Sequence, residues 1–411
     1  MKVLLISSKF PPEYSGSGIR ALRTYQRLSK KYNIEYEVLC NSSEPGNNKK
    51  YIYEGVSITL ISTSVCSFIT KRKNKIISYV TFLFKYYSEA FKTLKFLNNK
   101  KFDLIHSFGN STSVAVAAYM SRRLMTPMVI ELCNMPISNP YPYLPVLHHF
   151  VKSDFHQGKV FVAISKELES VCKEYGYNKN VWCRPNPINK DHFYVRSKSD
   201  KNNLRGKYSP FNSSDTVLVY IAKFRSRKNH IFLLDVLSRL PNRYKLVLAG
   251  PPDTQEKESK IKGGCLNRIN EKIRDLGLNA RVHMIVGETN VSEVLGLSDL
   301  FLFPSWNEGL GTVMIESFGC GIPVIANIAE SAFRQWIKDG ENGFLCELDP
   351  DRWVGAIMKS EGIDAERRNI ISNEIYSLAS SDIIDEGYYK IFNDLICLGY
   401  REEVNIEQVM K

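Results

Sequence analysis

Residues 304–323 read Pro-Ser-Trp-Asn-Glu-Gly-Leu-Gly-Thr-Val-Met-Ile-Glu-Ser-Phe-Gly-Cys-Gly-Ile-Pro, and this stretch decides the fold of the second half of the chain. The apolar run Asp299–Phe303 precedes it and predicts a strand, whereas Thr312–Cys320 predicts a short helix. A loop containing Gly309 and Gly311 joins the two. Such a loop presents backbone N–H groups at the positive end of the helix dipole, which suits a phosphate group.

Two carboxylates, Glu308 and Glu316, flank this loop with seven residues between them. Glu308 lies in the loop, and Glu316 lies one turn inside the predicted helix, where a carboxylate can accept hydrogen bonds from sugar hydroxyls. The stretch therefore predicts a site for a phosphorylated sugar. The alternative is an ordinary strand–loop–helix unit with two solvated carboxylates.

Short apolar runs alternate with longer amphipathic segments along the whole chain, which is typical of parallel sheets covered by helices. In the first half we expect strands at Val3–Ser7, Glu35–Cys40, Ser57–Ile61, Asp103–Ser107, Pro127–Leu132, Val160–Ile164 and Val181–Arg184. In the second half we expect them at Thr216–Ala222, Tyr244–Gly250, Arg281–Val286, Asp299–Phe303, Pro323–Asn327 and Gly343–Cys346. The pattern predicts an α/β fold in both halves.

A chain of 411 residues is too long for one typical hydrophobic core, so two domains are expected. The polar segment Val195–Ser214 separates the two halves and is interpreted as a linker. We therefore expect an N-terminal domain over residues 1–195 and a second domain over 215–384. Residues 385–411 include an amphipathic pattern, Asp385–Leu398, that predicts a terminal helix.

The Glu–x7–Glu spacing, together with Glu308-Gly309-Leu310-Gly311 and Gly319-Cys-Gly321-Ile-Pro-Val, resembles glycosyltransferase family 4 of the glycosyl transferases group 1. The resemblance implies the GT-B fold, with two facing Rossmann-like domains and an interdomain cleft. It also implies that the last helix packs back on the N-terminal domain. The activity it implies is that of a retaining glycosyltransferase of hexosyltransferase type.

By the same resemblance, Glu316 binds the ribose of the donor and Glu308 faces the donor sugar, while Gly309, Leu310, Gly311 and Thr312 form the donor loop. Ala222 and Lys223 stand where the family has a Gly-Arg pair, and Lys228 matches the family's lysine. Lys223 and Lys228 are catalytic candidates, because point cations can neutralise a departing diphosphate. Lysine at 223 lacks the bidentate fork of arginine. The alternative is a basic surface turn.

Three further glycines resemble donor-binding positions of the family. Gly16 and Gly18 lie in a loop after the first predicted strand, in the place of the family's glycine-rich first loop, and Gly250 ends the strand Tyr244–Gly250. Each glycine would let the backbone approach the donor phosphates or the nucleotide. For each, a simple tight turn remains the alternative.

Candidate acceptor or sugar contacts lie in the first half. His106 ends an Asp-x-x-His strand that resembles the family, and Glu131 and Asn134 flank the next predicted strand end. Many relatives carry a donor-contacting histidine where Cys133 stands here, so this position departs from the family. A structural role is the alternative for His106.

The amino-acid composition limits the possible partners and the cellular location of the protein. The formal net charge is +12, which suits phosphorylated substrates or an anionic surface, and no nucleic-acid-binding motif is present. Nine cysteines without a paired spacing favour a reducing cytoplasm over a disulfide framework. The start of the chain does not have the pattern of a signal peptide, and no apolar stretch reaches the length of a membrane span. No cofactor is expected, and no metal, since no Asp-x-Asp motif lies near the candidate site.

The segment Lys71–Lys101 combines lysines with aromatic and aliphatic residues, and Glu89 is its only acid. Such a segment can lie on an anionic membrane, with lysines reaching the headgroups. The alternative is a helix that packs on the sheet and has solvated lysines. If the segment does lie on a membrane, the sequence predicts a cytoplasmic protein that is peripheral to the inner face of the cell membrane.

The function predicted from these features is transfer of a sugar from a UDP- or GDP-sugar to a glycan or lipid-linked acceptor. The setting implied by the family is bacterial surface polysaccharide biosynthesis. Two alternatives stay open: a sugar-nucleotide epimerase on the same fold, and a non-catalytic nucleotide-sugar-binding relative.

Overall fold

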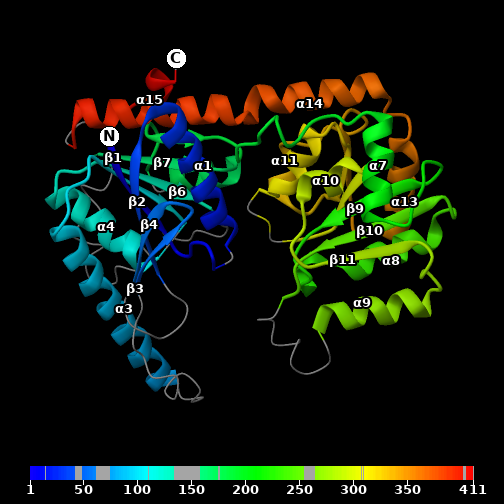
Figure 1. Ribbon diagram of the computed structural model, residues 1–411, viewed down its shortest axis with the longest axis horizontal. Helices are drawn as coiled ribbons and strands as arrows, with labels where there is room; N and C mark the ends of the chain where they lie inside the picture. The colour runs from blue at the N-terminus through cyan, green and yellow to red at the C-terminus, as the bar shows by residue number, and fades with distance from the viewer. Residues whose placement is uncertain are drawn as a thin grey trace. The chain divides into compact units, whose positions relative to one another are not determined.

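The computed structural model describes residues 1–13, 15–41, 49–61, 75–109, 111–133, 158–174, 176–253, 264–306, 308, 310–400 and 404–410. The chain divides into two compact units (Figure 1). Unit 1 comprises Met1–Arg184 and Ile384–Lys411, and unit 2 comprises Pro185–Ile383. The boundary at Arg184 lies earlier than the one expected from the polar segment.

The described part of unit 1 forms an eight-stranded sheet in the order β3-β4-β2-β1-β5-β6-β7-β8. All neighbouring strands are parallel except β3, which runs antiparallel to β4. The strands are β1 Lys2–Ser7, β2 Glu35–Asn41, β3 Lys49–Tyr53, β4 Val56–Ile61, β5 Leu104–Phe108, β6 Met128–Leu132, β7 Lys159–Ala163 and β8 Val181–Cys183. The helices are α1 Gly16–Tyr32, α3 Lys75–Asn98, α4 Thr112–Arg123, α6 Lys166–Glu174, α15 Ser381–Leu398 and α16 Ile406–Val409.

The core of unit 1 explains why its central strands are apolar along nearly their whole length. Strands β5, β6 and β7 are buried at every residue, as expected for parallel strands with both faces covered by helices. Helix α15 adds Tyr388, Phe392 and Leu395 to the same core that holds Leu5 and Phe108. The C-terminal helix thus packs on the N-terminal sheet.

Unit 2 contains a six-stranded, fully parallel sheet in the order β11-β10-β9-β12-β13-β14. The strands are β9 Thr216–Ile221, β10 Tyr244–Gly250, β11 Val282–Val286, β12 Leu300–Phe303, β13 Val324–Asn327 and β14 Gly343–Cys346. The helices are α7 Lys198–Tyr208, the short 3-10 helix η2 Ser226–Lys228, α8 His230–Arg239, α9 Gly264–Asp275, α10 Val291–Gly296, α11 Thr312–Gly319, α12 Ser331–Arg334, α13 Pro350–Ser360 and α14 Ala365–Ala379. The two parallel α/β sheets confirm the predicted fold class.

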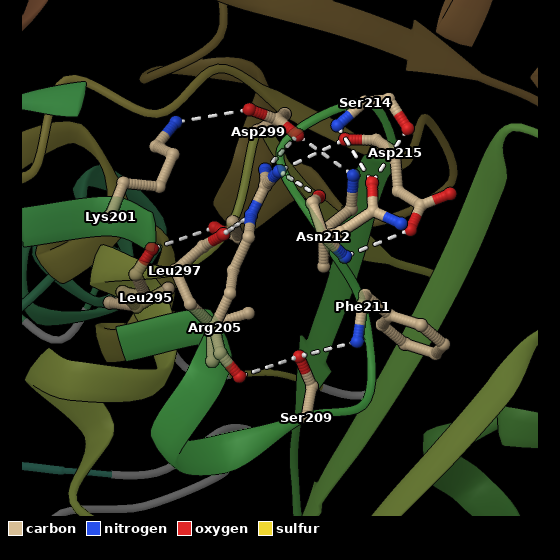
Figure 2. A network of polar contacts seen from close by, with 12 residues as sticks. Lys201, Arg205, Ser209, Phe211, Asn212, Ser214, Asp215, Leu295, Leu297 and Asp299 are labelled. Carbon is tan, nitrogen blue, oxygen red and sulfur yellow. Dashed lines mark hydrogen bonds and ion pairs between the residues drawn. The ribbon is translucent and has the colours of Figure 1, made fainter. Parts of the chain in front are cut away.

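The prediction of a linker over Val195–Ser214 is wrong, because this segment forms α7 and belongs to unit 2. Ser197 caps the helix by accepting a hydrogen bond from the Asp200 amide. Figure 2 shows how the buried Arg205 holds α7 against the sheet. Its guanidinium donates to the carboxylate of Asp299 at 2.6 Å and to the carbonyl oxygen of Leu297 at 3.0 Å.

Asp299 is the centre of this network. Besides Arg205 it accepts from Lys201 Nζ at 3.0 Å (Figure 2). It also accepts from the Val217 amide at 2.7 Å. Burial raises the pKa of Asp299, but Lys201 and Arg205 outweigh burial and hold the pKa below its ordinary value. The charged residues of the segment that suggested a linker therefore form an ionic network that holds α7 to unit 2.

Strand order fixes where each unit can hold a ligand. In unit 1 the order reverses between β1 and β5, and in unit 2 it reverses between β9 and β12. Ligands of open parallel sheets bind beyond the carboxyl ends of the strands at such a switch point. The loops that follow these four strands are therefore the expected ligand-binding positions.

Candidate functional site

In unit 2, the segments after β9 and β12 carry the charged residues singled out from the sequence. Ala222–Asn229 follows β9, and Pro304–Gly311 follows β12. Both strands are parallel and hydrogen-bonded neighbours, so their carboxyl ends lie at the same edge of the sheet. The structure brings Lys228 and Glu308 into contact there.

The Glu308 carboxylate is surrounded by donors. Its Oε1 accepts a short hydrogen bond from Lys228 Nζ, a second from Ser305 Oγ at 2.6 Å, and lies 3.4 Å from Arg227 Nη1. The Glu308 amide donates to Glu330 Oε2 at 2.9 Å, which fixes the backbone of the loop. Side-chain donors thus hold the carboxylate that is predicted to face the donor sugar, and Glu330 holds the backbone of the same residue.

Lys228 has a perturbed pKa. Burial lowers the pKa of this ammonium group and Arg227 lowers it further, while Glu308 opposes them without reversing the net shift. Perturbed groups gather at functional sites, although structural ion pairs also produce such shifts. Lys228, whose side chain is 13% exposed, and Arg227 therefore bring two cations to the switch point of unit 2.

Lys223 is engaged elsewhere. Its Nζ lies 3.1 Å from Oδ1 of the buried Asp253, and Arg225 Nε contacts the other oxygen of the same carboxylate. The two lysines expected to act together therefore have separate carboxylate partners, Asp253 for Lys223 and Glu308 for Lys228.

The donor loop ends at Gly311, which has a φ of 75° and precedes α11. A Cβ on this glycine would lie 2.6 Å from the ring of Phe303 and 2.9 Å from that of Phe333. Only glycine meets both the left-handed backbone and the close packing. Leu310 beside it is buried, and Gly309 lies outside the described residues.

Helix α11 carries Thr312 in its first turn and the half-buried Glu316 one turn further on. The Thr312 hydroxyl accepts a hydrogen bond from Asn186 Nδ2 at 2.6 Å. Asn186 is buried, and this hydrogen bond fixes the start of α11.

Gly250 has a structural reason to be glycine. A Cβ at this position would lie 2.2 Å from the carbonyl oxygen of Ala222, because the end of β10 packs against the backbone after β9. The missing side chain lets the backbone of Gly250 approach the backbone of Ala222. A contact of Gly250 with the nucleotide stays a prediction.

In unit 1, Gly16 and Gly18 begin α1, directly after the loop that follows β1. Ser15 caps this helix by accepting a hydrogen bond from the Gly18 amide at 3.3 Å. A Cβ on Gly18 would lie 2.4 Å from the carbonyl oxygen of Lys9, whereas the space around Gly16 is open. Gly16 is therefore the glycine of this pair whose surroundings leave room for a ligand.

A buried polar cluster lies where Arg20, two residues after Gly18, meets side chains of β5 and β6. Its centre is Glu131, whose side chain is 0% exposed. Arg20 Nη2 lies 2.9 Å from Oε1, Arg184 Nη2 lies 2.7 Å from Oε2, and the Tyr388 hydroxyl also donates to Oε2. Burial raises the pKa of Glu131, but the two arginines outweigh burial and keep its pKa below the ordinary value.

His106 belongs to the same cluster and is also fully buried. The Tyr25 hydroxyl lies 2.8 Å from its Nδ1. Burial lowers the pKa of His106 to about 3, so the ring is neutral at physiological pH. Neither His106 nor Glu131 presents surface to a ligand in this structure, so a positioning role replaces direct contact in our interpretation. Asn134 lies outside the described residues.

Sequence reasoning missed several members of both clusters. In unit 1 it missed Arg20, which donates to Cys133 Sγ at 2.8 Å and is 14% exposed. In unit 2 it missed the roles of Asp253, Ser305 and Glu330. The sequence could have indicated Arg20, because it lies two residues after the Gly16–Gly18 loop. The roles of the three residues in unit 2 depend on contacts between segments far apart in the sequence.

Two features are absent from the described residues. No group of three or more His, Cys, Asp or Glu side chains within them could hold a metal ion. None of the helices in the described ranges is long and apolar enough to cross a membrane.

Comparison with known proteins identifies the kind of protein this resembles. Residues 201–376 match the family described as Glycosyl transferases group 1. The N-acetyl-alpha-D-glucosaminyl L-malate synthase of Bacillus anthracis is 24% identical over 61% of this chain, and the match spans just under two thirds, 64%, of that protein. The capsular polysaccharide biosynthesis glycosyltransferase CapH of Staphylococcus aureus is 25% identical over 87% of this chain and 90% of its own length.

Among solved structures, HepE of Anabaena in complex with UDP is similar over 96% of this chain and 100% of its own, with a TM-score of 0.72 and 16% identity. At this identity the likeness shows the fold alone. The fold is that of the GT-B glycosyltransferases, as the sequence predicted.

Proposed function

We propose, on the premise that residues 201–376 belong to the glycosyl transferases group 1, that this protein is a retaining glycosyltransferase that uses a nucleotide-diphosphate-sugar. The observation that carries the proposal is the contact of Glu308 with Lys228, Arg227 and Ser305 at the switch point of unit 2. It places a carboxylate and two cations where a parallel sheet binds its ligand.

The donor would bind unit 2 through its diphosphate and its ribose. Lys228 and Arg227 are the cations nearest the loop that leads to α11, and backbone N–H groups at the start of that helix favour a phosphate group. Glu316, one turn into α11, would accept hydrogen bonds from the ribose hydroxyls. HepE of Anabaena was solved with UDP, which makes UDP-sugars the first donors to test.

In the proposed reaction the acceptor hydroxyl oxygen forms a bond to the anomeric carbon on the face from which the diphosphate leaves. The bond between that carbon and the diphosphate oxygen breaks, and a diphosphate oxygen takes the hydroxyl proton. Lys228, with Arg227 beside it, would stabilise the negative charge that develops on the leaving group. Glu308 would stabilise the positive charge on the sugar ring.

Lys223 would have a supporting role at this site. It shares the buried Asp253 with Arg225, so this carboxylate already compensates part of its charge. In unit 1, Glu131 and His106 would position Arg20 beneath the Gly16–Gly18 loop, from which Arg20 could reach an anionic group of a ligand. The acceptor is proposed to be a glycan or a lipid-linked sugar of a bacterial surface polysaccharide, by analogy with CapH.

The test measures donor binding and turnover separately. Wild type and the variants Glu316→Ala and Glu308→Ala would be titrated calorimetrically with UDP- and GDP-sugars and assayed for transfer with an acceptor panel. We expect Glu316→Ala mainly to weaken donor binding, and Glu308→Ala mainly to lower turnover. Glu366→Ala, an exposed carboxylate on α14, is the matched control.

The same assay separates the alternatives. An epimerase would convert the nucleotide-sugar without any acceptor, and a non-catalytic relative would bind the donor without turnover. If both glutamate variants bind and turn over donor like the Glu366→Ala control, the site assignment is refuted.

A further inference from the structure

The outer face of α3 in unit 1 is unusually apolar for a surface. Val80, Phe84, Tyr87 and Phe91 are 58%, 62%, 55% and 69% exposed. Their spacing along the helix places all four on one side, because residues three and four apart are neighbours on a helix. We call these four residues the α3 stripe.

The stripe is not the face that attaches α3 to the rest of unit 1. That attachment is made by the buried Tyr86, Thr93 and Leu97, on the other side of the helix. The Thr93 hydroxyl lies 3.0 Å from that of Ser113 on α4, and Figure 1 shows the two helices side by side. Four neighbouring exposed apolar side chains, three of them aromatic, mark an interaction surface.

Charge indicates which partner the stripe would take. Lys85, Lys92 and Lys95 follow one another along one flank of the stripe, and Lys85 is 45% exposed. Glu89 is the only acidic residue within α3, and it is buried on the inner side, 3.8 Å from Lys85 Nζ. The outer side of the helix therefore combines aromatic rings with positive charge and presents no carboxylate of its own.

We propose that the α3 stripe docks on an anionic lipid surface. The helix lies along that surface, with the rings at the boundary between headgroups and acyl chains and the lysines on the lipid phosphates. Aromatic rings with amphipathic character favour this depth. The stripe carries the membrane association that the basic composition of this segment suggested.

A second copy of the chain is the competing partner, and the charges disfavour it. Two stripes that pack face to face around a twofold axis would bring their lysine flanks close together without an acidic residue of α3 to neutralise them. An anionic bilayer, in contrast, compensates these charges. The proposal is also independent of sugar transfer, because it concerns binding measured without donor or acceptor.

The experiment is co-sedimentation of the full chain with vesicles of phosphatidylcholine alone or with about 30% phosphatidylglycerol, a content at which each basic residue near the surface contributes measurably. We expect binding to the anionic vesicles only. Phe84→Ser with Phe91→Ser removes ring burial and should lower the partition coefficient by about tenfold or more. Lys92→Glu with Lys95→Glu should lower it by a similar factor and weaken its salt dependence.

The controls change matching residues in unit 2. Leu378→Ser removes an apolar side chain that is 57% exposed, and Lys338→Glu with Lys359→Glu reverses two exposed charges. Both should bind vesicles like wild type. Circular dichroism and thermal melting of every variant would show whether both units keep their fold.

Three outcomes would overturn the proposal. They are equal binding to neutral and anionic vesicles, unchanged binding of the α3 variants, and a dimer in sedimentation velocity that dissociates on Phe84→Ser with Phe91→Ser while vesicles are not bound. Failure of the sugar-transfer assay would leave these readings unaffected, so the two proposals fail separately.

Discussion

Replacing Glu131 by glutamine should destabilise unit 1 strongly. The change keeps the shape of the side chain and removes its charge, which compensates Arg184 at 2.7 Å. Arg184 is 3% exposed and cannot reach water without opening the core, whereas Arg20 is 14% exposed and can turn outward. Removing one partner of a buried ion pair costs about 3–5 kcal/mol, because the other charge stays buried without compensation.

The assay has to follow unit 1 by itself, since a chain of two units need not unfold in one step. Hydrogen exchange in increasing urea, read on peptides from β6 and α15, gives the free energy of unfolding of this unit. For a unit of this size, 1 kcal/mol corresponds to roughly 2–4 °C in the melting temperature. We therefore expect the free energy of unfolding read from these peptides to fall by about 3–5 kcal/mol, which corresponds to a decrease of roughly 6–20 °C in the melting temperature of unit 1.

Two companion variants make the reasoning testable. Glu131→Leu combined with Arg184→Met removes both charges and should recover most of the lost stability, because an apolar pair of similar volume has no buried charge to compensate. Glu169→Gln, which breaks the pair of Glu169 with an exposed lysine on α6, should cost less than about 1 kcal/mol. A loss below about 0.5 kcal/mol for Glu131→Gln, within the range of ordinary surface changes, would refute the idea that Glu131 holds Arg184 in place.

Two further predictions concern unit 2. The folded-state pKa of Asp299 is lowered, so its contribution to stability is complete above the ordinary pKa of about 4 and is lost as pH falls below that value. The difference in urea midpoint between wild type and Asp299→Asn should therefore be constant above about pH 5 and shrink in more acidic solution. A difference independent of pH would contradict this. Gly311→Ala should cost about 1–3 kcal/mol by thermal melting, because the new Cβ meets the Phe303 ring with φ at 75°, whereas Gly206→Ala, an open position in α7, should stabilise slightly; equal melting temperatures would contradict it.

The fold class could be predicted from the sequence because central parallel strands bury both faces and leave long apolar runs. The strands Tyr244–Gly250 and Gly343–Cys346 agree with the expected bounds at both ends. Strand β3 was missed because Lys49–Tyr53 alternates at an exposed edge and carries two lysines. Helix α7 was missed for a different reason: its anchor is the charged Arg205, so its packing leaves no apolar periodicity in the sequence.

The candidate site was predictable in its motif and not in its contacts. The spacing of Glu308 and Glu316 is a local property of one loop and one helix, so the sequence contains it. The partner of each charge depends on which strands become neighbours. Lys228 reaches Glu308 because β9 lies beside β12, and that pairing is a property of the whole sheet.

The charged groups at the two switch points differ in how tightly they are buried, and this difference supports the proposal that the donor diphosphate binds unit 2. In unit 1, Glu131 is 0% exposed and lies in contact with two arginines and a tyrosine hydroxyl, so its charge is committed to the fold. In unit 2, the Lys228 and Glu308 side chains keep 13% and 11% exposure and lie beside a second cation. A leaving group needs cations that can exchange one anionic partner for another. Lys228 and Arg227 meet that requirement, whereas Arg184 does not, so the arginine of unit 1 that a ligand could reach is the more exposed Arg20.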